Sequence, residues 1–329
     1  MRRVGKAVSR TIAALTPFEL AILIVFIAIL IVTVIGPWIA PYPTETANPP
    51  QHLLSPRPSH WLGTDQNGMD ILSRILAAPR TDVLVAVVAT ALSVGIGSAL
   101  GALAGFFEGT RQKLASIMSE GMLRVLDVIQ AFPVFIFAMV LVAIRGARVE
   151  NVIAAVAFVN MPVFLRLVRS EILSLRERPY AEAARAVGNS DMGVVFKHLL
   201  PNALPVVVVQ TSVTVGFAIL LTAGLSFVGA GIRPPQPELG SMISTGSQYL
   251  ITGQWWASLF PGIALGIIVF AFAMVGESIG RIWQHGPGAA EIPGQIAPSP
   301  TGTPTAEGLV PALAPDVDVR PGTSWGDGG

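Results

Sequence analysis

The chain has 329 residues, of which 52% are apolar and only 12% are charged, and its mean hydropathy is +0.64. A soluble domain carries about 25% charged residues, so this composition indicates a membrane protein. The 21 basic against 20 acidic residues provide no basic surface for nucleic acid, and the absence of cysteine excludes disulfides, thiolate metal sites and cysteine nucleophiles.

Stretches without charged residues predict the membrane spans, because a charge at the bilayer centre costs about 2.5–3.5 kcal/mol. Six such runs stand out: 20–44, 83–107, 128–144, 151–165, 198–232 and 239–276. The run 151–165 is short, so it spans only if Arg166 and Arg169 extend to the interface. The last two runs are too long for one helix, and the Gly/Pro-rich stretch 229–240 is the expected loop. The sequence therefore predicts an all-α membrane protein with six transmembrane helices.

The distribution of Lys and Arg predicts the orientation. With the N-terminus inside, the cytoplasmic connections are 1–19, 108–127 and 166–204. Together with Arg281 they hold 14 basic residues, against 6 on the other side, which predicts that both termini are cytoplasmic. The basic N-terminus resembles a signal peptide, but its apolar stretch runs on to Ala40 without a clear cleavage site, so a retained first helix is expected. Residues 286–329 contain 8 Pro and 9 Gly and predict a disordered tail.

One cytoplasmic loop, residues 176–205, is too long for a plain connector. Pro179 is suited to begin a helix and Gly188 to end it. Ser190 or Asp191 can cap a second helix, which Pro201 is expected to stop. The product is a helix–turn–helix with a small Ala-rich face. Such a face suits insertion into a groove on another protein; an amphipathic helix resting on lipid headgroups is the alternative.

The same loop carries a motif of a known family. The spacing from Glu182-Ala183-Ala184 to Gly188, and then to His198-Leu199-Leu200-Pro201, resembles the EAA loop of ABC-importer permeases. Three further segments agree with the peptide-importer branch: Leu62 to Arg74, Ala131-Phe132-Pro133, and Leu225 to Gly240 followed by Trp255-Trp256. Over residues 17–284 the chain resembles the C-type permease subunit of dipeptide, oligopeptide and nickel importers. The chain departs from the usual pattern at Met69, where an Arg is typical, and at Glu277, where an Asp is expected.

The resemblance implies a type I ABC-importer permease fold. It divides the chain into a cytoplasmic segment 1–19, a first helix with an external loop 20–82, a core 83–284 that contains the coupling loop 176–205, and a tail 285–329. In this family the EAA loop docks into a groove of a cytoplasmic ATPase. Carried onto this chain, the contact residues are Glu182, Ala183, Ala184 and Gly188, with Leu200 and Pro201 fixing the second helix against the bundle.

The resemblance also implies the partners. These are a homologous B-type permease subunit, two ATP-binding subunits that hold ATP and Mg, an extracytoplasmic substrate-binding protein and the lipid bilayer of a bacterial plasma membrane. No cofactor or metal is expected on this chain, because its only Gly-Lys pair, Gly5-Lys6, follows no glycine-rich loop and its four histidines form no HExxH motif. The chain is therefore expected to be a transport subunit and not an enzyme.

Two further groups of residues have alternative interpretations. Asp65, Asp70 and Arg74, in the external segment, either touch a substrate-binding protein or hold the loop together through local hydrogen bonds and ion pairs. One helix face carries three glycines at i, i+4 and i+8, namely Gly97, Gly101 and Gly105. This spacing lets another helix approach closely. That helix belongs either to this chain or to the paired permease subunit.

The competing functions are other kinds of transporter. A secondary carrier usually keeps ionisable residues near the bilayer midplane, and the charge-free runs contain no Asp, Glu, Lys or Arg. An ATP-coupled exporter would not depend on an external binding protein. Within the importer class, dipeptides or oligopeptides are the expected substrates, with nickel chelates and glutathione as alternatives.

Overall fold

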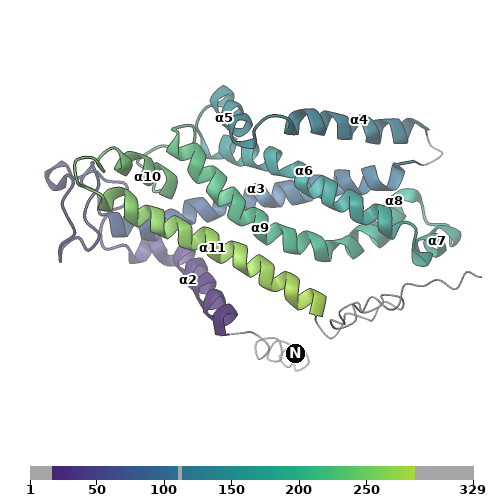
Figure 1. The fold of residues 1–329 in the computed structure, drawn as a ribbon, viewed down its shortest axis with the longest axis horizontal. Coiled ribbons are helices and arrows are strands. Elements are labelled where there is room, and N and C mark those ends of the chain that lie inside the picture. Colours follow the sequence, from purple (N-terminus) through teal and green to yellow (C-terminus); the bar gives the residue numbers. More distant parts are fainter. Residues whose placement is uncertain (1–16, 110–112, 286–329) are drawn as a thin grey trace, which may run out of the picture. The chain divides into compact units, whose positions relative to one another are not determined.

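The computed structural model describes residues 17–109 and 113–285, which are mostly helical and contain no β-strand (Figure 1). The helices are α2 (Pro17–Ile39), α3 (Ile71–Phe107), α4 (Lys113–Gln130), α5 (Val134–Arg145), α6 (Val149–Leu175), α7 (Pro179–Ala186), α8 (Asp191–Gly193), α9 (Leu200–Phe227), α10 (Leu239–Ser247) and α11 (Trp256–His285). A 3-10 turn, η1 (Pro49–Gln51), precedes α3, and a π-helical turn, η2 (Val194–Leu199), joins α8 to α9. The all-α prediction is confirmed, while the predicted features of residues 1–16 and 286–329 lie outside the described ranges.

Among the residues that the structure describes, five segments are long and apolar enough to cross a membrane: α2, α3, α6, the stretch Asp191–Phe227, and Trp256–Ser278 within α11. A sixth span is present if α4 and α5 are counted together. They would form a broken span, because the axes of Ser116–Gln130 and Val134–Arg145 differ by 92°. The six predicted spans are therefore matched if the broken pair counts as one span.

The predicted run 128–144 is not one straight helix. Instead α4 ends at Gln130 and α5 begins at Val134, with Pro133 as the residue that caps α5. A proline lacks the N–H that a helix interior needs, and it disfavours helical conformation in the residue before it. The Ala131-Phe132-Pro133 segment thus sets the bend between the two halves.

Two other helices are longer than their charge-free runs. Helix α3 begins at Ile71, where the Asp70 carboxylate accepts the Ser73 N–H, so Asp82 lies inside the helix rather than before it. Helix α6 runs through both arginines that were expected to extend to the interface. Arg166 instead pairs with Asp127 at 2.7 Å, and Arg169 pairs with a carboxylate at the end of α3. Acidic residues from other segments therefore pair with the two arginines that lie beyond the end of the charge-free run 151–165, so that α6 can extend through them.

Helices α3 and α6 lie side by side and run parallel (Figure 1). A Cβ on Gly97 would lie 2.6 Å from the Met161 carbonyl oxygen, and one on Gly105 would lie 2.7 Å from the Arg169 carbonyl oxygen. A Cβ on Gly101, between them, would overlap the Leu165 carbonyl. The three glycines therefore face α6 of the same chain, which is the intramolecular of the two interpretations.

The buried apolar side chains form two clusters. The larger one lies in the half of the bundle that carries the long loops, residues 40–70 and 228–255; we call this the long-loop end (left in Figure 1). The smaller lies at the opposite end, beside α7, and we call it the α7 cluster. Its buried members are Ala102, Phe106, Phe164, Val168, Ile172, Leu175, Ala181, Val194, Val195, Leu199, Ala203 and Val207. It joins the loop 176–205 to the ends of α3, α6 and α9.

Candidate functional site

The loop between α6 and α9 folds as its local sequence dictates. Pro179 occupies the first turn of α7, where its missing N–H is not needed. After the last turn Gly188 adopts φ +90°, its N–H donates to the Arg185 carbonyl, and the Asn189 N–H donates to the Ala184 carbonyl. These two bonds form a Schellman C-cap. The predicted helix start and the predicted glycine stop are both confirmed.

The second half of the loop differs from the prediction. The Ser190 hydroxyl oxygen accepts the Gly193 N–H, as expected for a cap. Pro201, however, does not stop the helix, because the chain continues through η2 into α9, which runs on to Phe227. The proline lies in the first turn of α9, and the π-helical turn before it closes with the Leu200 N–H donating to the Val195 carbonyl. A wider turn at this point accommodates the missing N–H without breaking the helix.

Helix α7 has one buried and one exposed side. Ala181 is fully buried in the α7 cluster, and Ala184 packs partly against it. Glu182 and Ala183 are exposed, as is Gly188. The hydrophobic side chain of Val187 is 84% exposed. One side of α7 is therefore a small exposed surface, and the opposite side packs against the α7 cluster.

Leu200 and Pro201 lie away from that surface. Leu200 is half-buried against the α7 cluster, while Pro201 is exposed on α9. The structure thus brings four of the six residues named from the motif together on α7 and its cap, and places the other two at the start of the following helix.

At the long-loop end, Asp65, Asp70 and Arg74 are buried, with exposures of 8%, 3% and 2%. Asp65 accepts the N–H groups of Asn67 and Met69, and its carboxylate lies 3.7 Å from the Arg74 Nε. Burial raises the pKa of the Asp65 carboxyl, and these contacts oppose the increase. The Arg74 guanidinium also donates to the Pro235 carbonyl at 3.2 Å. These side chains hold the loop to its neighbours, so the geometry favours the structural interpretation, and a contact with a binding protein stays a prediction.

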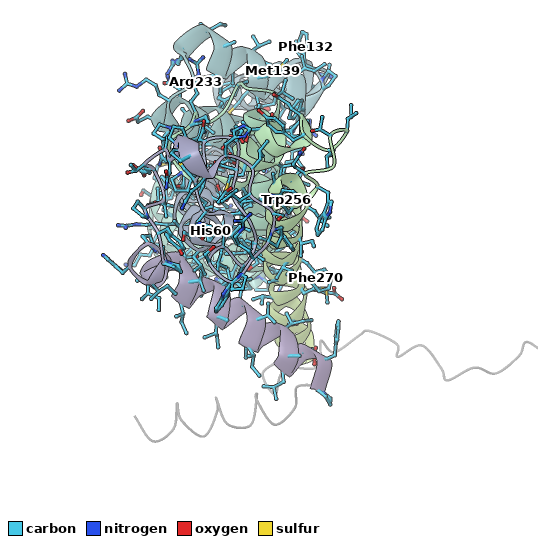
Figure 2. The ribbon with its side chains drawn as sticks, turned by 90° about the vertical axis from the view of Figure 1, so that its left-hand side faces the viewer. His60, Phe132, Met139, Arg233, Trp256 and Phe270 are labelled. Atoms are coloured by element: carbon cyan, nitrogen blue, oxygen red, sulfur yellow. The ribbon has the colours of Figure 1, made fainter. Side chains whose placement is uncertain are left out.

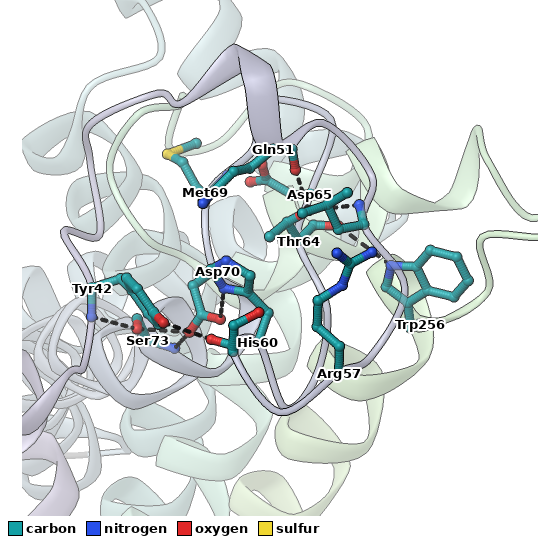
Figure 3. Close-up of polar contacts among 12 residues, drawn as sticks. Tyr42, Gln51, Arg57, His60, Thr64, Asp65, Met69, Asp70, Ser73 and Trp256 are labelled. Atoms are coloured by element: carbon teal, nitrogen blue, oxygen red, sulfur yellow. Dashed lines mark hydrogen bonds and ion pairs between the residues drawn. The ribbon is translucent and has the colours of Figure 1, made fainter.

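A histidine that the sequence did not single out completes this loop (Figure 3). The Nδ1 of buried His60 lies 2.9 Å from the Asp70 carboxylate, whose other oxygen accepts the Ser73 hydroxyl at 2.7 Å. Trp256 lies beside the loop, and its indole N–H donates to the Thr64 carbonyl at 3.4 Å. Viewed from this end, His60 and Trp256 lie near the middle of the molecule, whereas Arg233 lies near Met139 at the edge that α5 forms (Figure 2). Trp256, at the start of α11, therefore ties the last helix to this loop.

Two buried carboxyl groups meet at the N-terminus of α10. Fully buried Glu238 accepts the N–H groups of Gly240 and Ser241, at 3.1 Å and 2.6 Å. The Oδ2 of Asp82 accepts the Leu239 N–H at 3.3 Å, and its Oδ1 has no partner in the described part of the chain. Burial raises the pKa of Glu238 to about 7. This pair was not predicted, because Asp82 lies just outside the charge-free run 83–107.

We expect the substitution Asp82→Asn to stabilise the solubilised chain at pH 8. The folded chain keeps the Glu238 proton up to a pH of about 7, whereas the unfolded chain releases it near 4.5. Since the folded state then binds more protons, stability falls as the pH rises between these values. An amide at position 82 would keep an acceptor for the Leu239 N–H and would remove the second carboxyl group, whose charge would repel the Glu238 carboxylate. Relieving an unfavourable interaction of a buried polar group is worth about 1–3 kcal/mol.

The measurement is the melting temperature between pH 5 and pH 8. Asp82→Asn should raise it by a few degrees at pH 8 and flatten its decline, while Glu177→Gln, which changes an exposed carboxylate, should leave both unchanged. A lower melting temperature for Asp82→Asn at pH 8 would show that the carboxyl groups of Asp82 and Glu238 do not destabilise each other in the folded chain.

Comparison with known proteins identifies the family. The family model described as binding-protein-dependent transport system inner membrane component matches residues 97–285, and the N-terminal TM domain of oligopeptide transport permease C matches residues 19–56.

Curated relatives agree along most of the chain. The dipeptide transport system permease protein of Alkalihalophilus pseudofirmus is 35% identical over 257 residues, covering 78% of this chain and 82% of that protein. A probable D,D-dipeptide transport system permease protein of Escherichia coli K12 is 32% identical, covering 80% and 86%. A glutathione transport system permease protein of Pectobacterium atrosepticum is 37% identical, covering 68% and 72%.

A solved structure shares the fold. The MetNI methionine ABC transporter in inward-facing conformations aligns with a TM-score of 0.50 at 22% identity, covering 62% of this chain and 93% of that chain. The spans, the capped helix α7 and these matches lead to one conclusion. The chain belongs to the family of inner-membrane permease components of binding-protein-dependent ABC importers.

Proposed function

We propose that this chain forms half of the translocation pathway of an importer for dipeptides and other short peptides, and that α7 couples it to a separate ATPase. The observation that carries the proposal is the exposed Glu182–Gly188 surface of α7, which rests directly on the buried α7 cluster. A force on this surface is therefore transmitted to α3, α6 and α9 through packed side chains of the α7 cluster and not through a flexible linker. The relatives named for dipeptides and D,D-dipeptides support short peptides as the cargo.

Glutathione is the second candidate substrate. It is itself a short peptide, and a relative that covers 68% of this chain is named for its transport. Nickel chelates remain an alternative that rests on the sequence resemblance alone.

The proposal assigns an orientation. The α7 end lies in the cytoplasm and the long-loop end outside, so that both termini are cytoplasmic. The 14 to 6 distribution of basic residues supports this assignment. The ATP and Mg are bound by two partner subunits, a homologous B-type permease completes the pathway, and a binding protein delivers the substrate. This subunit performs no chemistry of its own.

The test is transport by the reconstituted complex. Proteoliposomes that contain this chain, its B-type partner and the ATPase should take up a labelled dipeptide only when ATP and the binding protein are both present. Unlabelled dipeptide, glutathione and a nickel chelate are then added as competitors to identify the substrate class. Uptake that persists without ATP would instead support a secondary carrier, and export without a binding protein would support an exporter.

A further inference from the structure

The end of α3 nearest α7 is held by side chains from other helices. The last carbonyl groups of a helix have no partner within it. Here the Nη1 of Arg176, which follows α6, donates to the carbonyl oxygens of Gly105, Phe106 and Glu108, at 2.9 Å, 3.1 Å and 2.6 Å. A cation at this position also complements the negative end of the helix dipole. One guanidinium nitrogen thus caps α3 from outside.

A second arginine strengthens the same junction. The Glu108 carboxylate, at the C-cap of α3, accepts two hydrogen bonds from Arg169 of α6, at 2.7 Å and 2.6 Å. Both side chains are between a quarter and a third exposed, so water only partly screens the pair. Two parallel bonds between a guanidinium and a carboxylate fix distance and angle together. The junction between α3 and α6 is therefore rigid as well as close.

Helix α7 reaches α3 directly. The Arg185 guanidinium carbon lies 5.2 Å from the centre of the Phe106 ring, over its face. Phe106 is only 4% exposed and belongs to the α7 cluster, as does Ala181 of α7. The α7 surface proposed to meet the ATPase and the capped end of α3 are thus two sides of one packed unit.

We propose that α3 moves together with the coupling loop, residues 176–205, and that Arg176 and Arg185 are the positioning residues that attach α3 to this loop. This inference rests on the proposed function and goes beyond it, because it names the path by which movement of α7 enters the membrane. The path continues along α3, whose glycines at 97, 101 and 105 seat it against α6. Because packed cores resist continuous deformation, we expect a junction held by two arginines and a packed aromatic ring to shift as one unit.

The first experiment substitutes Arg176 in the reconstituted complex. Arg176→Met keeps the length of the side chain but removes its donors and its charge. We expect uptake per ATP hydrolysed to fall about threefold to tenfold while the complex still assembles and hydrolyses ATP. Arg176→Lys should recover much of the loss, because a single guanidinium nitrogen with two N–H groups makes all three contacts, and an ammonium group offers three N–H donors from one nitrogen. Arg124→Met, which removes an exposed arginine on α4, is the matched control and should not change the ratio.

The second experiment is a double-mutant cycle, which remains decisive if Arg176→Met fails to assemble. Arg185→Gln should lower uptake per ATP in the wild type but have no further effect in a Phe106→Leu background. If Arg185 acted only by touching the ATPase, the two effects would add, and the attachment to α3 would be refuted.

The outcomes separate this inference from the proposed function. A wild-type complex without ATP-dependent uptake would overturn the proposed function. A wild-type complex that imports, together with an unchanged ratio in assembled Arg176→Met, would overturn the role of Arg176 alone. Reduced coupling that Arg176→Lys restores, with a non-additive cycle, would support both positioning residues.

Discussion

Replacing Gly188 by valine should strongly reduce ATP-driven uptake while leaving the chain inserted and assembled. Gly188 adopts φ +90°, a conformation in which a β-branched side chain is strongly strained, by about 1–3 kcal/mol or more. Relieving that strain would break the two bonds that end α7, from Gly188 to Arg185 and from Asn189 to Ala184. Helix α7 would then lose its fixed direction, and its exposed surface would no longer match a rigid groove. We expect at least a tenfold loss of uptake in proteoliposomes, about 1.4 kcal/mol per factor of ten.

Two control variants isolate the backbone as the cause. A Cβ added at Gly188 would meet no atom within 4 Å, and the same is true at Gly95 within α3. Gly95→Val should therefore leave uptake nearly unchanged, since Gly95 has no positive φ. Gly188→Asn should retain most of the activity, because asparagine tolerates this conformation better than valine. Normal uptake by Gly188→Val would mean that the cap does not orient α7 for coupling.

Local signals predicted most of this site. The start of α7 at Pro179, its stop at Gly188 and the cap at Ser190 each depend on a residue's own backbone chemistry, which a sequence displays directly. The glycines of α3 were similarly readable, because spacing alone places them on one face. The sequence could not say which helix they meet, and the structure assigns α6 of the same chain.

Features set by distant neighbours were not predictable. Pro201 reads as a stop, yet a π-helical turn before it lets the helix continue, and the cluster of buried residues around Leu199 supports that turn. The arginines of α6 read as a limit to the span, yet Asp127 and Glu108 neutralise them from other helices. In each case the local rule is overridden by a contact between residues far apart in the chain. Helix ends that depend on a local cap were predictable, whereas ends that depend on a contact with a distant residue were not.

The α3–α6 contact leads to the second large effect. Along α3, the positions of Gly97, Gly101 and Gly105 touch backbone atoms of α6, and backbone cannot rotate away as a side chain can. The Ser93 hydroxyl crosses the same interface and donates to the Ala157 carbonyl at 2.8 Å. Without a hydrophobic force between helices in lipid, such close packing and interhelical hydrogen bonds are what hold the pair. Even one added methyl group must therefore push the helices apart.

Alanine at two glycines of the same helix should have opposite effects. Gly101→Ala places a methyl group against the Leu165 carbonyl, and we expect a loss of about 2–3 kcal/mol in stability, as for other overpacked cores. Gly95→Ala meets open space, and the better helix propensity of alanine should stabilise the chain by about 0.5–1 kcal/mol. Thermal unfolding of the purified full chain in one detergent measures both. The helix, the substitution and the change in propensity are identical, so a difference in sign can only come from contact with α6. Equal melting temperatures for the two variants would show that α3 and α6 are not packed as closely as these glycines allow.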